Sequence, residues 1–202
     1  YLLKPIKKDE LTDTLTRLGE KLRERTRQLS YEEKVLRTLK SDEETLRQTF
    51  LSDLVYRRDK TLKTASLDRI NEDFHYGLRL GNFCFGILKL DGHVFDDMEN
   101  LRFMADKVRG VMDRLLPECT FDYELLVAGS FFYFLLNFEE SMRSQVRRQM
   151  KALFDEVRIQ GGILKDFAAT LSLGIVCGGL DGLDSSLKNA RLLIEERLVA
   201  GT

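Results

Sequence analysis

Leucines recur every seven residues through the first quarter of this chain. Leu15, Leu22, Leu29 and Leu36 occupy one position of the repeat, and its complementary position holds Leu11, Leu18, Leu39 and Leu46. An apolar a/d repeat over four or more heptads is typical of a coiled coil. A helix of ~50 residues at ~1.5 Å per residue would span roughly 75 Å and could not bury its leucines alone. We therefore expect residues 8–58 to form a helical linker that pairs two protomers as a homodimer through these leucines.

Polar residues interrupt the repeat at Arg25, Glu32 and Glu43, and the segments that begin at Ser30 and Ser41 fit the capping-box pattern of a helix start. These interruptions suit a second arrangement, a helical hairpin packed on the following domain. The unbroken heptad register favours one long helix or two nearly collinear ones. The two arrangements differ in whether the leucines contact a second copy of the chain.

Strand and helix patterns alternate in the rest of the chain. Residues 59–81 form a polar connector, with a short helix expected over residues 66–76 and ended by Gly77. The domain after this connector covers residues 82–202. Its expected strands are residues 82–91, 121–128, 131–138 and 167–177, and its expected helices are residues 96–116, 141–160 and 185–199. This order predicts an α/β (α+β) sandwich in which helices flank a central mixed sheet.

Charge and cysteine content exclude several classes of function. Lys and Arg number 32 against 33 Asp and Glu, so the net charge of −1 gives no global signal for nucleic-acid binding. Cys84, Cys119 and Cys177 lack a CxxC spacing and are expected to be structural free thiols in a reducing cytoplasm. His75 and His93 lack zinc-site spacing, so neither a metal nor a cofactor is expected. No apolar run approaches the ~20 residues of a membrane span.

A local basic face occurs within the expected helix at residues 141–160. Arg143, Arg147 and Lys151 are four residues apart and therefore share one side of that helix. A solvated face is the ordinary interpretation of such a set. Contact with a nucleotide phosphate or with DNA is the alternative.

Three local features resemble the GGDEF (diguanylate cyclase) family over residues 82–201. The strand at residues 85–91 resembles the family's first strand, which ends in a metal-binding aspartate, here Asp91. The segment Ala128-Gly129-Ser130-Phe131-Phe132 aligns without a gap with the signature hairpin, and residues 171–176 resemble a late strand of the fold. The resemblance implies a nucleotide-cyclase-like domain.

The departures from the family pattern concern catalysis. A cyclase needs two carboxylates to hold divalent metal against a triphosphate, but Ser130 and Phe131 stand where the acidic pair would be. Cys119 replaces the arginine of the product-inhibition motif, although Asp122 is present. The resemblance therefore implies a degenerate, non-catalytic domain in which Asp91 is a vestigial ligand candidate. Two alternatives stay open: a cleft that binds a nucleotide or other small molecule without turnover, and an active cyclase.

The first seven residues resemble a second family. Residues 1–7 are similar to the last strand of a response-regulator receiver domain, in which the lysine of a Lys-Pro pair, here Lys4 and Pro5, contacts the phosphoryl group. Together the segments resemble the middle of an AraC-type two-component response regulator, so we expect the chain to be a fragment of a longer protein. The resemblance implies a transcriptional regulator that relays phosphorylation state. Its partners would be a cognate sensor histidine kinase and DNA, both bound through domains absent from this chain.

Overall fold

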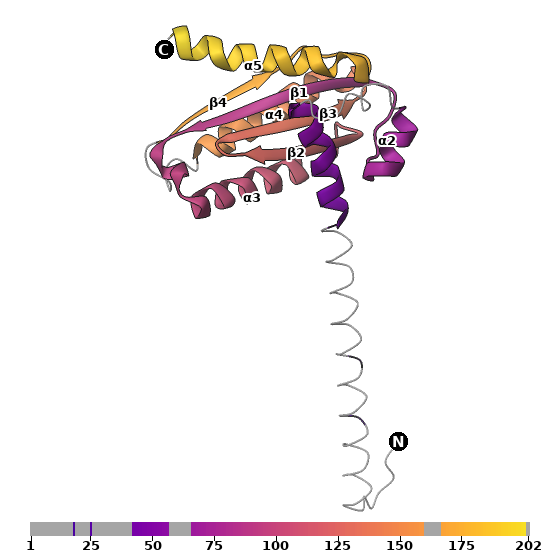
Figure 1. Cartoon of the computed structure of the whole chain (residues 1–202), viewed down its shortest axis with the longest axis horizontal. Coiled ribbons are helices and arrows are strands. Elements are labelled where there is room, and N and C mark those ends of the chain that lie inside the picture. Colours follow the sequence, from indigo (N-terminus) through magenta and orange to yellow (C-terminus); the bar gives the residue numbers. More distant parts are fainter. Residues whose placement is uncertain (1–17, 19–24, 26–41, 57–65, 160–166, 201–202) are drawn as a thin grey trace, which may run out of the picture. The chain divides into compact units, whose positions relative to one another are not determined.

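The structure is a computed structural model that describes residues 18, 25, 42–56, 66–159 and 167–200 (Figure 1). The chain divides into two compact units, Tyr1–Glu44 and Thr45–Thr202. In the first unit the described residues, which include Leu18 and Arg25, are helical and exposed. The receiver-like Lys4 and Pro5 and the remaining heptad leucines of that unit (Leu11, Leu15, Leu22, Leu29, Leu36 and Leu39) lie outside the described residues. Pairing through the leucine repeat stays a prediction.

The second unit is built on a four-stranded sheet. Its strands are β1 (Asn82–Asp91), β2 (Asp122–Ala128), β3 (Phe131–Phe138) and β4 (Ala168–Leu173), in the order β2-β3-β1-β4. The predicted combination of helices with a central sheet is confirmed, but the prediction of a mixed sheet is wrong, because each of these strand pairings is antiparallel. The crossover from β1 to β2 and the crossover from β3 to β4 each join two strands that run in the same direction. One antiparallel strand lies between the two strands of each pair. This is the split β-α-β arrangement of ferredoxin-like folds.

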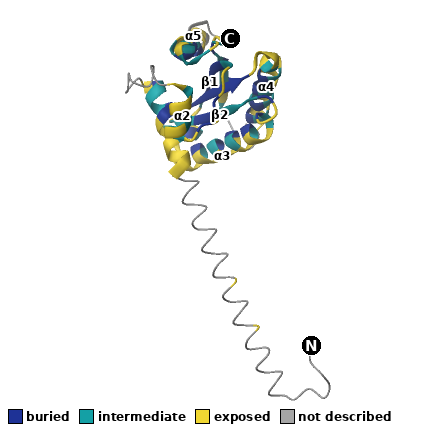
Figure 2. Ribbon diagram, turned by 90° about the vertical axis from the view of Figure 1, so that its right-hand side faces the viewer, coloured by how far each residue is buried: buried dark blue, intermediate teal, exposed yellow. Residues whose placement is uncertain are grey.

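Helices cover both faces of the sheet (Figure 2). On one face, α3 (Met98–Leu115) and α4 (Arg143–Ile159) pack side chains such as Met104 and Met150 against Phe132 and Phe134 of β3. On the other face, α2 (Leu67–Phe74), α5 (Leu183–Ala200) and helical residues 45–56 pack against Tyr133 and Leu135. The strand β3 is therefore apolar on both sides, as expected for a central strand that lies between two helical layers.

The boundary of the linker differs from the predicted one. Residues 42–56 are helical, but the second unit begins at Thr45, upstream of the predicted end of the linker at residue 58 and of the predicted domain start at residue 82. Phe50, Leu51 and Val55 are each 1% exposed or less in the core. After Leu46, which is 38% exposed, the apolar residues follow a stripe that faces the sheet, so this part of the helix is a piece of the domain.

Local hydrogen bonds account for several element ends. Ser66 Oγ accepts from the Arg69 N–H and begins α2, one residue after the predicted start. Asp97 accepts from the Glu99 N–H and begins α3, two residues after the predicted start. The helix α2 ends at His75, which takes the left-handed conformation at φ 55°, so the prediction that Gly77 ends it is wrong. The observed strand β4 is shorter than the predicted residues 167–177, and beyond it Cys177 forms an isolated bridge with Phe83.

The chain leaves β4 through a close backbone contact at Gly174. The Gly174 N–H donates to the Phe85 carbonyl at 2.8 Å, and Ser186 Oγ of α5 accepts from the Phe85 N–H at 2.9 Å. A Cβ atom on Gly174 would lie 2.0 Å from the Ser186 carbonyl oxygen. Only glycine allows the strand end and α5 to approach this closely.

We expect Gly174→Ala to lower the free energy of unfolding by about 2–3 kcal/mol, because α5 must move away from the sheet to admit the methyl group. Gly110→Ala is the matched control, since Gly110 is an exposed residue of α3 with no atom within 4 Å of an added Cβ. It should be neutral or stabilise by up to about 1 kcal/mol. Urea unfolding followed by circular dichroism measures both values, and equal effects of the two substitutions would contradict the packing argument.

The three cysteines carry free thiols in the structure, as expected. Among the described helices, none is both long enough and apolar enough to cross a membrane.

Candidate functional site

The signature segment forms the turn between β2 and β3, next to the end of β1. Gly129 adopts φ 56°, a conformation that glycine tolerates without strain. The Ser130 carbonyl accepts from the Leu90 N–H at 2.9 Å, which places the turn beside Asp91. The structure therefore brings together Asp91 and the hairpin turn, two elements that the resemblance related to each other.

Asp91 has a cationic partner at this place. The Lys89 ammonium lies 2.6 Å from Asp91 Oδ1 and 5.7 Å from the centre of the Phe131 ring. Lys89 is opposite Phe131 in the β1–β3 pairing, and its side chain is 15% exposed. The ammonium thus neutralises the Asp91 carboxylate and repels a second positive charge there. Among the described residues, no three His, Cys, Asp or Glu side chains are grouped so as to hold a metal ion.

The two histidines have other surroundings. His75 ends α2, and His93 begins the 3₁₀ turn His93–Asp96, where its ring lies 3.3 Å from the exposed Asp96 carboxylate. Both side chains of the His93–Asp96 pair are exposed.

A second cluster, which the sequence did not predict, is centred on Arg47. The Arg47 guanidinium donates to Asp122 Oδ1 at 2.7 Å and to Glu124 Oε2 at 2.6 Å, and it also donates to the backbone carbonyls of His75 and Tyr123. Both carboxylates come from β2. The Glu124 side chain is only 5% exposed, so Arg47 neutralises a buried charge, which the more distant Arg109 also approaches, at 3.9 Å.

The connector between α2 and β1 completes this cluster. The Tyr76 hydroxyl donates to the Arg47 carbonyl at 2.8 Å, and the guanidinium lies 4.2 Å from the centre of the Tyr76 ring. The Gly77 N–H donates to Asp122 Oδ2 at 2.6 Å. We call Arg47, Tyr76, Asp122 and Glu124 the Arg47 anchor. It ties helical residues 45–56, the connector and β2 together at one point.

The pKa values in the anchor follow from burial and charge. Burial alone would lower the pKa of the Arg47 guanidinium, but its hydrogen bonds and charge pairing with Asp122 and Glu124 outweigh that effect and raise it above the ordinary value. Burial, assisted by the Glu124 charge, raises the pKa of the Tyr76 phenol above its usual range. Arg47 therefore stays charged and Tyr76 stays neutral throughout the physiological pH range.

Asp122 is the one anchor residue that the sequence singled out, and its partner differs from the expected one. In the resemblance it belonged to an Arg-x-x-Asp motif broken at Cys119. In the structure its arginine comes from residue 47, on the other side of the connector. Glu124, a carboxylate inside an otherwise apolar strand, was the available sequence signal that a buried cation had to lie nearby.

Comparisons with known proteins give no relative: no protein-family model matches this chain, and neither a curated protein nor a solved structure matches it significantly.

Proposed function

We propose that this chain is the non-catalytic relay and pairing segment of an AraC-type two-component response regulator. Its linker would pair two protomers, and its degenerate GGDEF-like domain would pass receiver-driven movement to DNA-binding domains outside this chain. The observation that carries the proposal is the Arg47 anchor. The helix that follows the leucine repeat is held in the domain by ionic hydrogen bonds and by Phe50, Leu51 and Val55 in the core.

This attachment supports a relay for a mechanical reason. A helix joined to a domain by a loop can rotate without moving it, whereas a helix built into the core cannot. A change of register or rotation in a paired linker would therefore move β2 through Arg47. In the proposed protein the signal would begin at a phosphorylated receiver whose switch lysine is Lys4, after transfer from a sensor histidine kinase, and would end at DNA.

The non-catalytic part of the proposal is supported at the hairpin. Ser130 and Phe131 supply no carboxylate there, and Asp91 is already paired with Lys89. Divalent metal held against a triphosphate requires several anionic oxygens. A domain of this kind would keep the shape of a cyclase-like fold and use it for contact and movement.

Sedimentation of the 202-residue chain tests the pairing. We expect a dimer for the unaltered chain and a monomer for Leu22→Asp/Leu29→Asp, because carboxylates placed in the apolar seam cost more than the leucine contacts supply. Thr16→Asp/Ser30→Asp is the control, since it adds the same charge one residue after Leu15 and Leu29, on the outward side of the repeat. It should stay dimeric.

Two outcomes would count against the proposal. A monomeric unaltered chain at concentrations up to about 100 µM would remove the pairing that the relay needs and would favour the helical hairpin packed on the following domain. Equal dissociation by both double substitutions would show that the added charge, and not the heptad position, is responsible.

A further inference from the structure

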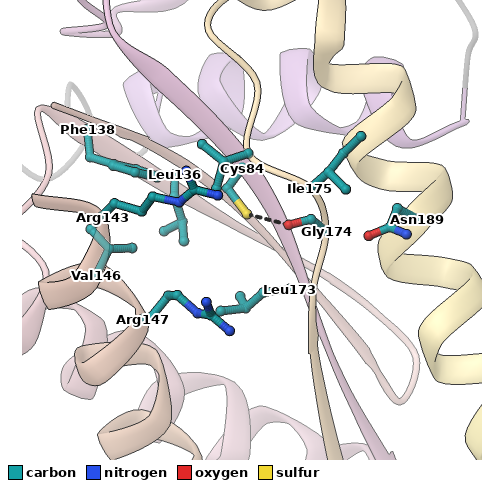
Figure 3. Close-up of a pocket in the computed structure, with 11 residues that line it drawn as sticks. Cys84, Leu136, Phe138, Arg143, Val146, Arg147, Leu173, Gly174, Ile175 and Asn189 are labelled. Atoms are coloured by element: carbon teal, nitrogen blue, oxygen red, sulfur yellow. Dashed lines mark hydrogen bonds between the residues drawn. The ribbon is translucent and has the colours of Figure 1, made fainter. Parts of the chain in front are cut away.

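A cavity of about 190 Å³ lies between α4, α5 and the sheet (Figure 3). It is at the start of β1, near Cys84, whereas the signature turn is at the end of β1, near Leu90. Six residues of strand separate the two places by about 20 Å. The cavity is therefore distinct from the degenerate hairpin, and its chemistry is independent of the proposed relay function.

Two arginines of α4 supply the charge of this cavity. Figure 3 shows the side chains of Arg143 and Arg147 extending from α4 toward Cys84 and Leu173, with Asn189 of α5 on the opposite wall. Arg143 forms an ion pair with Glu140 at 3.4 Å, and both of these side chains are at least half exposed. Arg147 has no hydrogen-bond or ion-pair partner within the part of the chain that the structure describes.

Beneath the arginines the cavity is apolar and uncharged. Leu136, Phe138, Val146 and Leu173 line it, and none of the described lining residues is acidic. The Cys84 thiol donates to the Gly174 carbonyl at 3.3 Å. Burial raises the pKa of this thiol to about 11, so the thiol is neutral near pH 7. Two guanidinium groups thus face a hydrocarbon floor with no anion inside to neutralise them.

We propose that this cavity binds a small monocarboxylate with a short apolar body, held by the forked guanidinium groups of Arg143 and Arg147. A planar carboxylate matches the fork of donors, and its hydrocarbon part covers the apolar floor. A free phosphate carries oxygens on every side and would press some of them against the hydrocarbon unpaired. The cavity volume of about 190 Å³ has room for a short-chain acid.

The probes for this proposal are butyrate, its neutral amide butyramide and inorganic phosphate, titrated into the full chain. The readout is the set of amide ¹H–¹⁵N shifts at Cys84 and Gly174. We expect butyrate to bind with a dissociation constant below about 10 mM, and butyramide at least tenfold more weakly, because the amide loses the charge-assisted hydrogen bonds. Phosphate should also bind more weakly than butyrate.

Three substitutions complete the test. Arg147→Gln should weaken butyrate binding about tenfold, and Glu140→Gln should strengthen it severalfold, because it removes the carboxylate that competes for Arg143. Arg148→Gln is the control. It changes the next arginine of α4, which does not line this cavity, and should alter binding less than about twofold. Glu140→Gln is expected to increase the affinity for butyrate, so it tests the proposal even if Arg147→Gln impairs folding.

Several results would overturn the assignment. Butyramide binding as tightly as butyrate would show that the arginines do not act on the ligand. Tighter binding of phosphate would show that the site selects charge and not a carboxylate with an apolar body. No saturable shift with any probe, or equal effects of Arg147→Gln and Arg148→Gln, would show that the cavity is not the proposed site.

Discussion

A chain that begins at Thr45 is expected to fold as a stable domain, whereas a chain that begins at Ser66 is expected to lose cooperative folding. The boundary between the compact units lies at residue 45, and residues 45–56 fill the core between the sheet, α2 and α5. Loss of the Phe50 and Leu51 side chains alone would cost roughly 5–10 kcal/mol. That amount is comparable with the entire net stability of an ordinary domain, about 5–15 kcal/mol.

Thermal unfolding of the two truncated chains provides the measurement. The chain of residues 45–202 should unfold in one transition, and the chain of residues 66–202 should show no transition and bind a hydrophobic dye. A matched pair in the full chain is Leu51→Ala, expected to cost about 3 kcal/mol, and Leu46→Ala, expected to cost less than about 1 kcal/mol because Leu46 is 38% exposed. Cooperative unfolding of both truncated chains at similar temperatures would contradict the assignment of residues 45–56 to the core.

The strands and their connections were predictable because their signals are local. The strand Asn82–Asp91 and the start of β3 at Phe131 match the predicted positions, since continuous apolar runs and a glycine turn define them. Except for the β2–β3 hairpin, the direction of pairing was not predictable in the same way. Antiparallel pairing follows from which strand lies between β1 and β2, and that choice depends on how helices pack over the whole sheet.

The end of the linker was missed because two helical patterns overlap without a break. The heptad leucines continue to Leu46, and the stripe that begins at Phe50 has nearly the same period. Periodicity alone does not say whether a helix faces a second chain or its own domain. The buried fractions of Phe50 and Leu51 decide the question for residues 45–56 and leave the pairing of the earlier leucines as a prediction.

The sequence likewise indicated one of the candidate sites and not the other. Asp91 and the hairpin turn lie together as the resemblance implied, because one strand pairing aligns them. The role of Arg47 was not predictable from the sequence, since its partners Asp122 and Glu124 follow more than seventy residues later. Nothing in its local pattern separates it from the other arginines of the linker.

Arg47→Met is expected to lower the free energy of unfolding of the full chain by about 3–5 kcal/mol. The substitution keeps the length and most of the apolar packing of the side chain but leaves Asp122 without its cation and Glu124 with only the more distant Arg109, at 3.9 Å. A buried carboxylate that has lost its partner carries the full cost of its desolvation. Arg69→Met is the control, because Arg69 forms an exposed i,i+4 pair with Asp73 at 3.3 Å and should change stability by less than about 0.5 kcal/mol.

A double substitution separates the charge effect from lost packing. Adding Glu124→Gln to Arg47→Met removes the buried charge that has lost its hydrogen-bonded cation and should restore about 1–2 kcal/mol, even though it deletes a second native group. Urea unfolding of the single and double variants at pH 7 gives these values. If Glu124→Gln makes the Arg47→Met variant still less stable, packing against Tyr76 and the backbone contacts would account for the role of Arg47. The ionic attachment on which the proposed relay depends would then be without support.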